Sequence, residues 1–277
     1  MTQLGPGVTK YNIGAHVFGQ GSPVAPTPDS QGLQEYATLL ASDSALVPEG
    51  ISDEQAATLP TNVVTAFTAL FKATNFALPF PPIEGFDYAS QTLVIIGGGS
   101  NVGRLTLQIA KLIGLGTVIA VASLSGEQEL KALGATHVVD RYSDDVARDI
   151  YAIMGGPDSV TKVFDCVNWT YEFAAGLVSS TRPGKIVTLH QAPTAVTELE
   201  RLGKKEVTAN IAMGIREHFT ELAEGLWGNI GNWLIQGKIK PGKYRVIEGL
   251  DEEKINEALD SYRDGKPVLQ AVIRPSG

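Results

Sequence analysis

The run LVIIGGGSNVGRLTLQIAK, residues 93–111, constrains the fold more than any other part of the chain. Apolar residues typical of a buried strand lead into glycines at positions 97, 98, 99 and 103. Leu105, Ile109 and Leu112 then recur at helical spacing. A strand, a glycine turn and a helix in this order are typical of the first unit of a doubly wound sheet, where the helix N-terminus receives a phosphate. We therefore predict an α/β, Rossmann-type fold with a dinucleotide site in this turn.

The glycine turn matches the G-x-G-x-x-G pattern imperfectly. Aligned on its last glycine, Gly103, the pattern begins at Gly98 and has Ser100 in place of the second glycine. We predict that backbone amides of the turn hold a pyrophosphate at the positive end of the following helix. The predicted contact residues are Gly98, Gly99, Ser100, Asn101, Val102 and Gly103. The alternative is an ordinary tight turn of a doubly wound protein, without a dinucleotide.

Strands and helices alternate regularly after this turn. Apolar strands that alternate with helices indicate a parallel sheet covered on both faces. The further strands are predicted at 117–123, 137–140, 162–168 and 185–190, and the helices at 102–113, 127–134, 144–155 and 171–180. We assign residues 62–236 to the dinucleotide-binding domain, with a helix from about 62 after Pro60. Residues 1–61 and 237–277 are assigned to a second domain.

The end of the second strand of the predicted sheet indicates which nicotinamide cofactor is bound. An NAD-binding fold places Asp or Glu about 20 residues after the glycine turn, where it holds the ribose hydroxyls. Here that position is Ser123, followed by Ser125, and both hydroxyls can hydrogen-bond a 2′-phosphate that a carboxylate would repel. Arg141 supplies a cation and Tyr142 an aromatic ring for adenine. The sequence favours NADPH over NADH, although Arg141 could instead pair with the acidic residues that follow it.

Composition excludes several classes of partner. The formal net charge is -8 with a pI near 5.1, which argues against nucleic acid or an anionic membrane as the main partner. No apolar run approaches the length of a membrane span, and the first residues lack the pattern of a signal peptide. The single cysteine, Cys166, excludes an internal disulfide and is expected to be core. We predict a cytoplasmic protein.

Several landmarks in their order resemble one enzyme superfamily. They are LGPGVTKYNIGAHVFG, EYATLLASDSALVPEGISDEQAATLPTNVVTAFTALF, KALGATHVVD, VFDCVN, GKIVTLH and LDEEKINEALDSYRDGK. Together they resemble the zinc-independent branch of the medium-chain dehydrogenase/reductase superfamily, which includes quinone oxidoreductases and trans-acting enoyl reductases of fungal polyketide pathways. Two departures stand out. Ala15 replaces the usual Asp, and the chain begins inside the family's substrate domain, so it is short at its N-terminus.

The resemblance implies a second, reduced GroES-like β-rich substrate domain built from both ends of the chain. It also implies a homodimer formed through the edge strand of the nucleotide domain. It places Thr65 near the nicotinamide and ribose, with Asn62 one helical turn earlier facing the substrate and Val167 against the cofactor. The alternative for Asn62 and Thr65 is capping of the helix after Pro60. His190 ends a strand at the edge where such sheets bind ligands, so it either donates a proton or only bounds the pocket.

The zinc-dependent relatives use cysteine, histidine and carboxylate ligands plus a four-cysteine lobe. One cysteine and four histidines cannot build either zinc site, so we predict no metal. The predicted function is NADPH-dependent reduction of an activated double bond or a quinone, with a small conjugated carbonyl compound as substrate. The alternatives are a catalytically impaired NADPH-binding accessory or sensor protein, and a zinc-free alcohol dehydrogenase.

Overall fold

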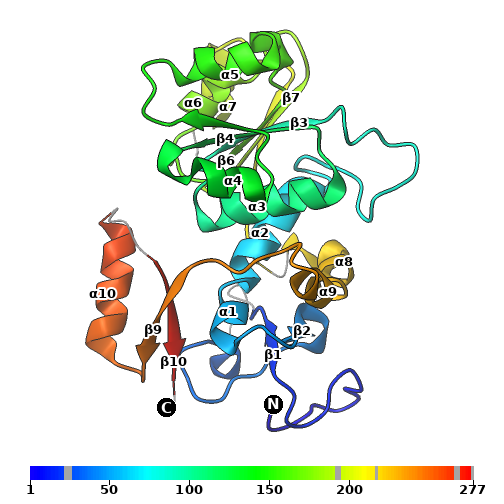
Figure 1. Ribbon diagram of the computed structural model, residues 1–277, viewed down its shortest axis with the longest axis vertical. Coiled ribbons are helices and arrows are strands. Elements are labelled where there is room, and N and C mark those ends of the chain that lie inside the picture. Colours follow the sequence, from blue (N-terminus) through cyan, green and yellow to red (C-terminus); the bar gives the residue numbers. More distant parts are fainter. Residues whose placement is uncertain (22–26, 191–194, 216–217, 265–268, 276–277) are drawn as a thin grey trace. The chain divides into compact units, whose positions relative to one another are not determined.

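The computed structural model describes residues 1–21, 27–190, 195–215, 218–264 and 269–275. The chain divides into two compact units. The first contains Met1–Val64 and Gly214–Gly277, and the second contains Thr65–Met213 (Figure 1). The second unit carries the glycine turn and is described first.

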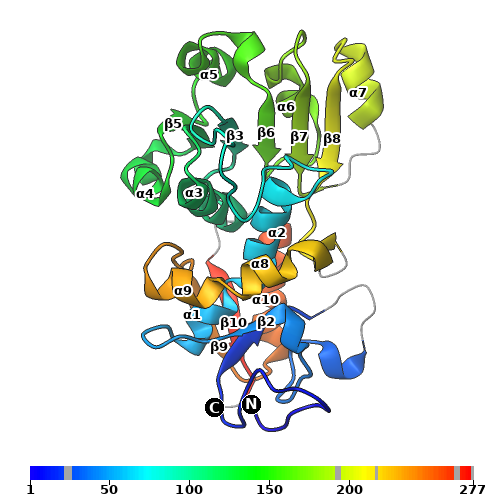
Figure 2. The same cartoon turned by 90° about the vertical axis from the view of Figure 1, so that its right-hand side faces the viewer.

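The second unit is built on a parallel sheet, in which the described residues form six strands (Figure 2). The strand order is β5-β4-β3-β6-β7-β8, so the chain starts in the middle and winds outward in both directions. This order is that of a Rossmann fold, and its switch point lies between β3 and β6. The bounds are β3 (Thr92–Ile96), β4 (Thr117–Ala122), β5 (His137–Asp140), β6 (Lys162–Asp165), β7 (Gly184–Thr188) and β8 (Val207–Ile211). The predicted fold class is confirmed.

Helices cover both faces of this sheet, as apolar strands require. In Figure 1, α5 (Val146–Met154), α6 (Glu172–Leu177) and α7 (Ala195–Arg201) lie on one side of the sheet. The other side carries α3 (Asn101–Ile113) and α4 (Glu127–Leu133). Ile150 of α5 and Ala174 of α6 join Val94 and Ile119 of the strands in one buried cluster.

Two predicted strands end earlier than expected, and one strand is absent from the prediction. The predicted strand 162–168 ends at Asp165, because the Asp165 carboxylate accepts hydrogen bonds from the backbone N–H groups of Val167 and Asn168 and turns the chain. The predicted strand 185–190 ends at Thr188, whose hydroxyl donates to the His190 carbonyl at 2.8 Å. The edge strand β8 was not predicted at all.

The first unit combines short strand pairs with helices. Antiparallel β1 (Val17–Gly19) and β2 (Ser44–Leu46) form one pair, and parallel β9 (Tyr244–Glu248) and β10 (Gln270–Arg274) form another. The helices are α1 (Asp53–Ala57), α8 (Ala223–Trp227), α9 (Ile230–Ile235) and α10 (Glu252–Arg263). Ser52 caps α1 in the capping box that its spacing with Gln55 suggests.

The unit boundaries differ from the predicted 62–236. Residues 214–236 cluster with the first unit, where Trp227 packs edge-on against Phe18 with ring centroids 5.9 Å apart. At the other end the boundary falls inside α2 (Pro60–Phe71), which begins at Pro60 itself. Proline suits the first turn of a helix because its missing N–H would have no partner there. No helix in the described ranges is long and apolar enough to cross a membrane.

An ion pair network in the first unit makes its stability depend on pH. Arg274 of β10 bonds Glu54 of α1 and, at 2.5 Å, Glu248 of β9. Hydrogen bonds from Arg274, from backbone and from Ser52 lower the pKa of Glu54 from 4.5 to about 2. The folded pKa lies below the unfolded one, so the contribution is present above pH 4.5 and is lost as pH falls toward 2.

We expect Glu54→Gln to lower the melting temperature at pH 7 and to have a smaller effect at pH 3. Thermal melts of the wild type and the variant across this range measure the difference. Glu257→Gln, at an exposed glutamate of α10, is the control and should show little effect at either pH. A gap between wild type and Glu54→Gln that does not narrow on acidification would contradict this account.

Candidate cofactor site

The glycine turn joins β3 to α3 at the switch point of the sheet. Gly97 has a φ of 79°, a left-handed conformation that favours glycine. Its N–H and that of Gly98 both donate to the Val121 carbonyl of β4, at 3.0 and 3.1 Å. Ser100 caps α3, and its Oγ accepts a hydrogen bond from the Gly103 N–H at 3.1 Å. The serine that breaks the G-x-G-x-x-G pattern therefore has a structural role at the helix N-terminus.

The glycines of the turn differ in whether the structure leaves room for a side chain. A Cβ atom at Gly98 would lie 2.6 Å from the Ala120 Cβ, and one at Gly103 would lie 2.4 Å from the Gly97 carbonyl oxygen. At Gly99 the nearest atom would be the Ala122 Cβ, at an ordinary 3.9 Å. Gly98 and Gly103 thus allow the turn, strand and helix to pack closely, while Gly99 leaves room beside the pocket.

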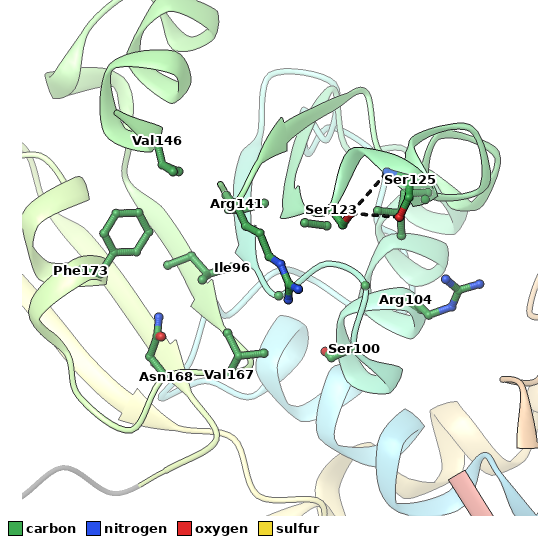
Figure 3. Close-up of a pocket in the computed structure, with 16 residues that line it drawn as sticks. Ile96, Ser100, Arg104, Ser123, Ser125, Arg141, Val146, Val167, Asn168 and Phe173 are labelled. Carbon is green, nitrogen blue, oxygen red and sulfur yellow. Dashed lines mark hydrogen bonds between the residues drawn. The ribbon is translucent and has the colours of Figure 1, made fainter. Parts of the chain in front are cut away.

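A pocket of about 810 Å³ opens beside this turn. It lies at the carboxyl ends of β3, β4, β5 and β6, where open α/β sheets bind ligands. The predicted contact residues that line it are Gly99, Ser100, Ser123, Ser125, Arg141 and Val167. Figure 3 shows Arg141 extending from the end of β5 toward the middle of the pocket. The structure thus brings together residues from four separate βα connections.

Other predicted residues lie outside this lining. Gly98, Asn101, Val102 and Gly103 belong to the turn and to the start of α3 and are not among the residues that line the pocket. Tyr142 is 70% exposed, and the Arg141 guanidinium lies over its ring with Cζ 4.6 Å from the centroid. Arg141 also donates to the Tyr142 hydroxyl.

The three predicted catalytic residues are held in different surroundings. Thr65 is buried in α2 at the start of the second unit. Asn62 belongs to the first unit, and its Nδ2 donates to the Thr58 carbonyl at 3.1 Å and to Gln270 Oε1 at 3.3 Å. The His190 ring stacks on Trp169, with centroids 3.6 Å apart. None of the three is among the residues that line the pocket.

Sequence reasoning missed part of the pocket wall. Arg104 projects from the first turn of α3, and its guanidinium forms an ion pair with Glu129 of α4. A single arginine in a helix gives no sequence signal for a site. The other unpredicted residues of the lining are Ile96, Gly97, Val121, Ala122, Gly126, Leu130, Val146, Asn168 and Phe173. Most are apolar and resemble ordinary core residues in the sequence.

The charge of the lining is positive. Arg104 and Arg141 both line the pocket, and no carboxylate is among the described residues that do so. The hydroxyls of Ser123 and Ser125 lie 2.9 Å apart at the end of β4 (Figure 3). Two guanidinium groups and two hydroxyls offer hydrogen-bond donors suited to a phosphate.

A buried aspartate shapes the far wall of the pocket. Asp165 accepts hydrogen bonds from the backbone N–H groups of Val167 and Asn168, at 3.1 and 3.0 Å, and from Asn168 Nδ2 at 2.8 Å. These bonds hold both residues where they line the pocket. Burial and the nearby Asp165 charge raise the pKa of the Cys166 thiol well above its usual range, against a smaller opposite effect of a hydrogen bond with Ser100. Cys166 is therefore an inert core residue beneath the turn.

No group of three or more His, Cys, Asp or Glu side chains in the described ranges could hold a metal ion. This observation concerns the side chains and their spacing.

Comparison with known proteins defines the class. A family model described as zinc-binding dehydrogenase matches residues 101–226. The dehydrogenase pigH of Monascus ruber is 31% identical over 300 residues, covering 99% of this chain and 80% of pigH. The trans-enoyl reductase himH of Aspergillus japonicus is 29% identical over 284 residues, covering 100% of this chain and 78% of himH.

A solved quinone oxidoreductase from Pseudomonas syringae pv. tomato DC3000 shares the fold. Its TM-score is 0.70 at 19% identity, over 99% of this chain and 78% of its own. The fold, the pocket and these relatives define an oxidoreductase of a class whose members bind nicotinamide cofactors. The chain belongs to the medium-chain dehydrogenase/reductase superfamily.

Proposed function

We propose that this protein uses NADPH to reduce an activated carbon–carbon double bond or a quinone. The observation that carries the proposal is the pocket at the glycine turn, in which Arg104, Arg141, Ser123 and Ser125 form a positive, hydroxyl-rich lining. A carboxylate at this place would favour NADH, because it would bond the ribose hydroxyls and repel a 2′-phosphate. The described lining contains none.

The residues present fit a dinucleotide. The first turn of α3 and the open space at Gly99 suit a pyrophosphate, since helix N-termini attract anions through free N–H groups. Ser123, Ser125 and Arg141 would hold the 2′-phosphate at the end of β4. Val146 and Phe173 offer an apolar wall for adenine, in place of the predicted Tyr142.

The acceptor class is inferred from the relatives and from the site chemistry. The names of two relatives specify enoyl reduction and quinone oxidoreduction. When bound, NADPH would supply the hydride, and the chain would bind and orient the reactants. Enones, enoyl thioesters and quinones delocalise the arriving charge onto an oxygen that hydrogen bonds can stabilise.

Thr65, Asn62 and His190 stay our candidates for the nicotinamide and substrate end of the site. A threonine hydroxyl and an asparagine amide could hydrogen-bond a carbonyl oxygen, and an imidazole could donate a proton. Homodimer formation through an edge strand of this sheet, whose edges are β5 and β8, likewise stays a prediction.

Binding and turnover test the proposal separately. We expect NADPH to raise the melting temperature, since a ligand at 100 times its Kd stabilises a folded protein by about 2.7 kcal/mol. We expect absorbance of the reduced nicotinamide to fall when an enone, an enoyl thioester or a quinone is added, and NADH to be a weaker donor. Binding without turnover of any acceptor would favour the impaired accessory protein. Turnover with a simple ketone alone would favour an alcohol dehydrogenase.

A further inference from the structure

Arg104 is held in the pocket wall by the fold itself. It lies in the first turn of α3, one residue after Gly103, and its side chain is 20% exposed. Its Nη2 pairs with Glu129 Oε1 of α4, a side chain that is 43% exposed. The pair joins two helices on the same face of the sheet. The guanidinium is thereby held at the pocket that the loop after β4 also lines.

We propose that Arg104 is a second cation of the 2′-phosphate subsite and that Glu129 sets the strength of this subsite. The inference rests on the proposed use of NADPH and adds to it a pair of residues that determines cofactor specificity. Arg104 would contact the phosphate directly. Glu129 would act through Arg104 and is a positioning residue.

The arrangement of side chains supports a shared phosphate. In the view of Figure 3, Ser123 and Ser125 lie between Arg141 on one side and Arg104 on the other. All four residues line the same pocket. A phosphate hydrogen-bonded to the two hydroxyls would therefore share this pocket with two guanidinium groups that come from different elements.

The chemistry of the ion pair leaves Arg104 able to bind an anion. A guanidinium carries five N–H donors in a fixed fork, and the contact with Glu129 uses donors of Nη2. A phosphate monoester carries about -1.5 to -2 charges at pH 7. The negative charge of Glu129 offsets part of the attraction between Arg104 and a phosphate. The ion pair therefore orients the guanidinium but weakens its contact with the anion.

Two small nucleotides isolate the subsite from the rest of the cofactor. Adenosine 2′,5′-bisphosphate and 5′-AMP differ only in the 2′-phosphate, and neither carries nicotinamide. We expect Arg104→Leu to weaken binding of the bisphosphate about tenfold or more, because hydrogen bonds to charged groups are strong. We expect 5′-AMP to change less than about twofold. Calorimetric titration measures both.

Arg201→Leu is the matched control. Arg201 is an arginine of α7, ion-paired with Glu198 at 2.5 Å, and it is not among the residues that line the pocket. Its loss should leave both affinities unchanged. Equal weakening of both nucleotides by Arg104→Leu, or no weakening of either, would overturn the role of Arg104.

Glu129→Gln tests the same subsite without removing the arginine. Glutamine keeps a hydrogen-bond acceptor for Arg104 and removes the negative charge. We expect the bisphosphate to bind about threefold more tightly at low salt, with the gain shrinking as salt screens the charges. Unchanged or weaker binding would overturn the role of Glu129. If Arg104→Leu fails to fold, Glu129→Gln alone tests whether the Arg104–Glu129 pair affects binding of the bisphosphate.

The wild type separates this proposal from the proposed function. If the wild type binds the bisphosphate no better than 5′-AMP, the assignment of NADPH itself is wrong. If the wild type prefers the bisphosphate and Arg104→Leu retains the preference, only the role of Arg104 is wrong. A wild type that binds neither nucleotide would overturn both.

Discussion

Gly103→Ala is expected to remove measurable NADPH binding and to lower the stability of the second unit. The new Cβ would lie 2.4 Å from the Gly97 carbonyl oxygen and 2.9 Å from the Gly98 Cα. Both neighbours are backbone atoms of the turn, so relief of the contact must shift the turn and the start of α3. Overpacking of this kind costs about 1–3 kcal/mol. Loss of the turn geometry should weaken NADPH binding by roughly a hundredfold or more, because the turn positions the N-terminus of α3, where we propose that the pyrophosphate binds.

Two other glycines separate folding from binding. Gly176→Ala, in α6 with no atom within 4 Å of the new Cβ, should melt no lower than the wild type. Gly99→Ala should also melt like the wild type, since its Cβ would make an ordinary contact with Ala122. Because Gly99 lines the pocket, Gly99→Ala should nevertheless bind NADPH more weakly than the wild type does. Melting curves and NADPH fluorescence titrations measure the two effects. Normal NADPH binding by Gly103→Ala would rule out the glycine turn as the anion site.

Arg141→Glu should reverse the preference between the two nicotinamide cofactors. The substitution replaces a cation of the pocket lining with an anion, so a 2′-phosphate would lose a charged partner and meet repulsion. We expect NADPH to bind about a hundredfold more weakly, a change of roughly 2.7 kcal/mol, while NADH changes little. Dissociation constants for both cofactors, measured side by side by fluorescence titration, give the ratio.

Arg148→Glu provides the control for overall charge. Arg148 lies in α5 and is 70% exposed, with its guanidinium 3.5 Å from Asp149, and it does not line the pocket. It makes the same change in net charge as Arg141→Glu. An equal loss of NADPH affinity in both variants would mean that long-range charge, and not a local contact, sets the preference.

Local patterns in the sequence were sufficient to predict most strands and helices of the second unit. The apolar strands and the amphipathic helix are recognised from the spacing of apolar residues within a short stretch, and the turn between them from its glycines. Because the turn is local, the sequence also predicted Gly99 and Ser100 as site residues, and both line the pocket.

Other features depended on contacts between distant segments. In the edge strand β8, Thr208 and Asn210 alternate with three apolar residues, so it lacks the continuous apolar run of a central strand. The end of β6 is set by the Asp165 side chain, which accepts hydrogen bonds from two backbone N–H groups. Every loop has such N–H groups, so the sequence does not mark this position. The assignment of residues 214–236 to the first unit follows from packing such as that of Trp227 on Phe18.

The pocket shows the same division between local pattern and tertiary structure. The sequence by itself determined the Rossmann fold, the turn and the serines after β4, because each is encoded by residues close together in the chain. Only the tertiary structure decided that Arg104, Val146 and Phe173 share the pocket with them. Parallel strands bring their carboxyl ends to one edge of the sheet, so side chains far apart in sequence come together there. No local sequence pattern predicts such a contact.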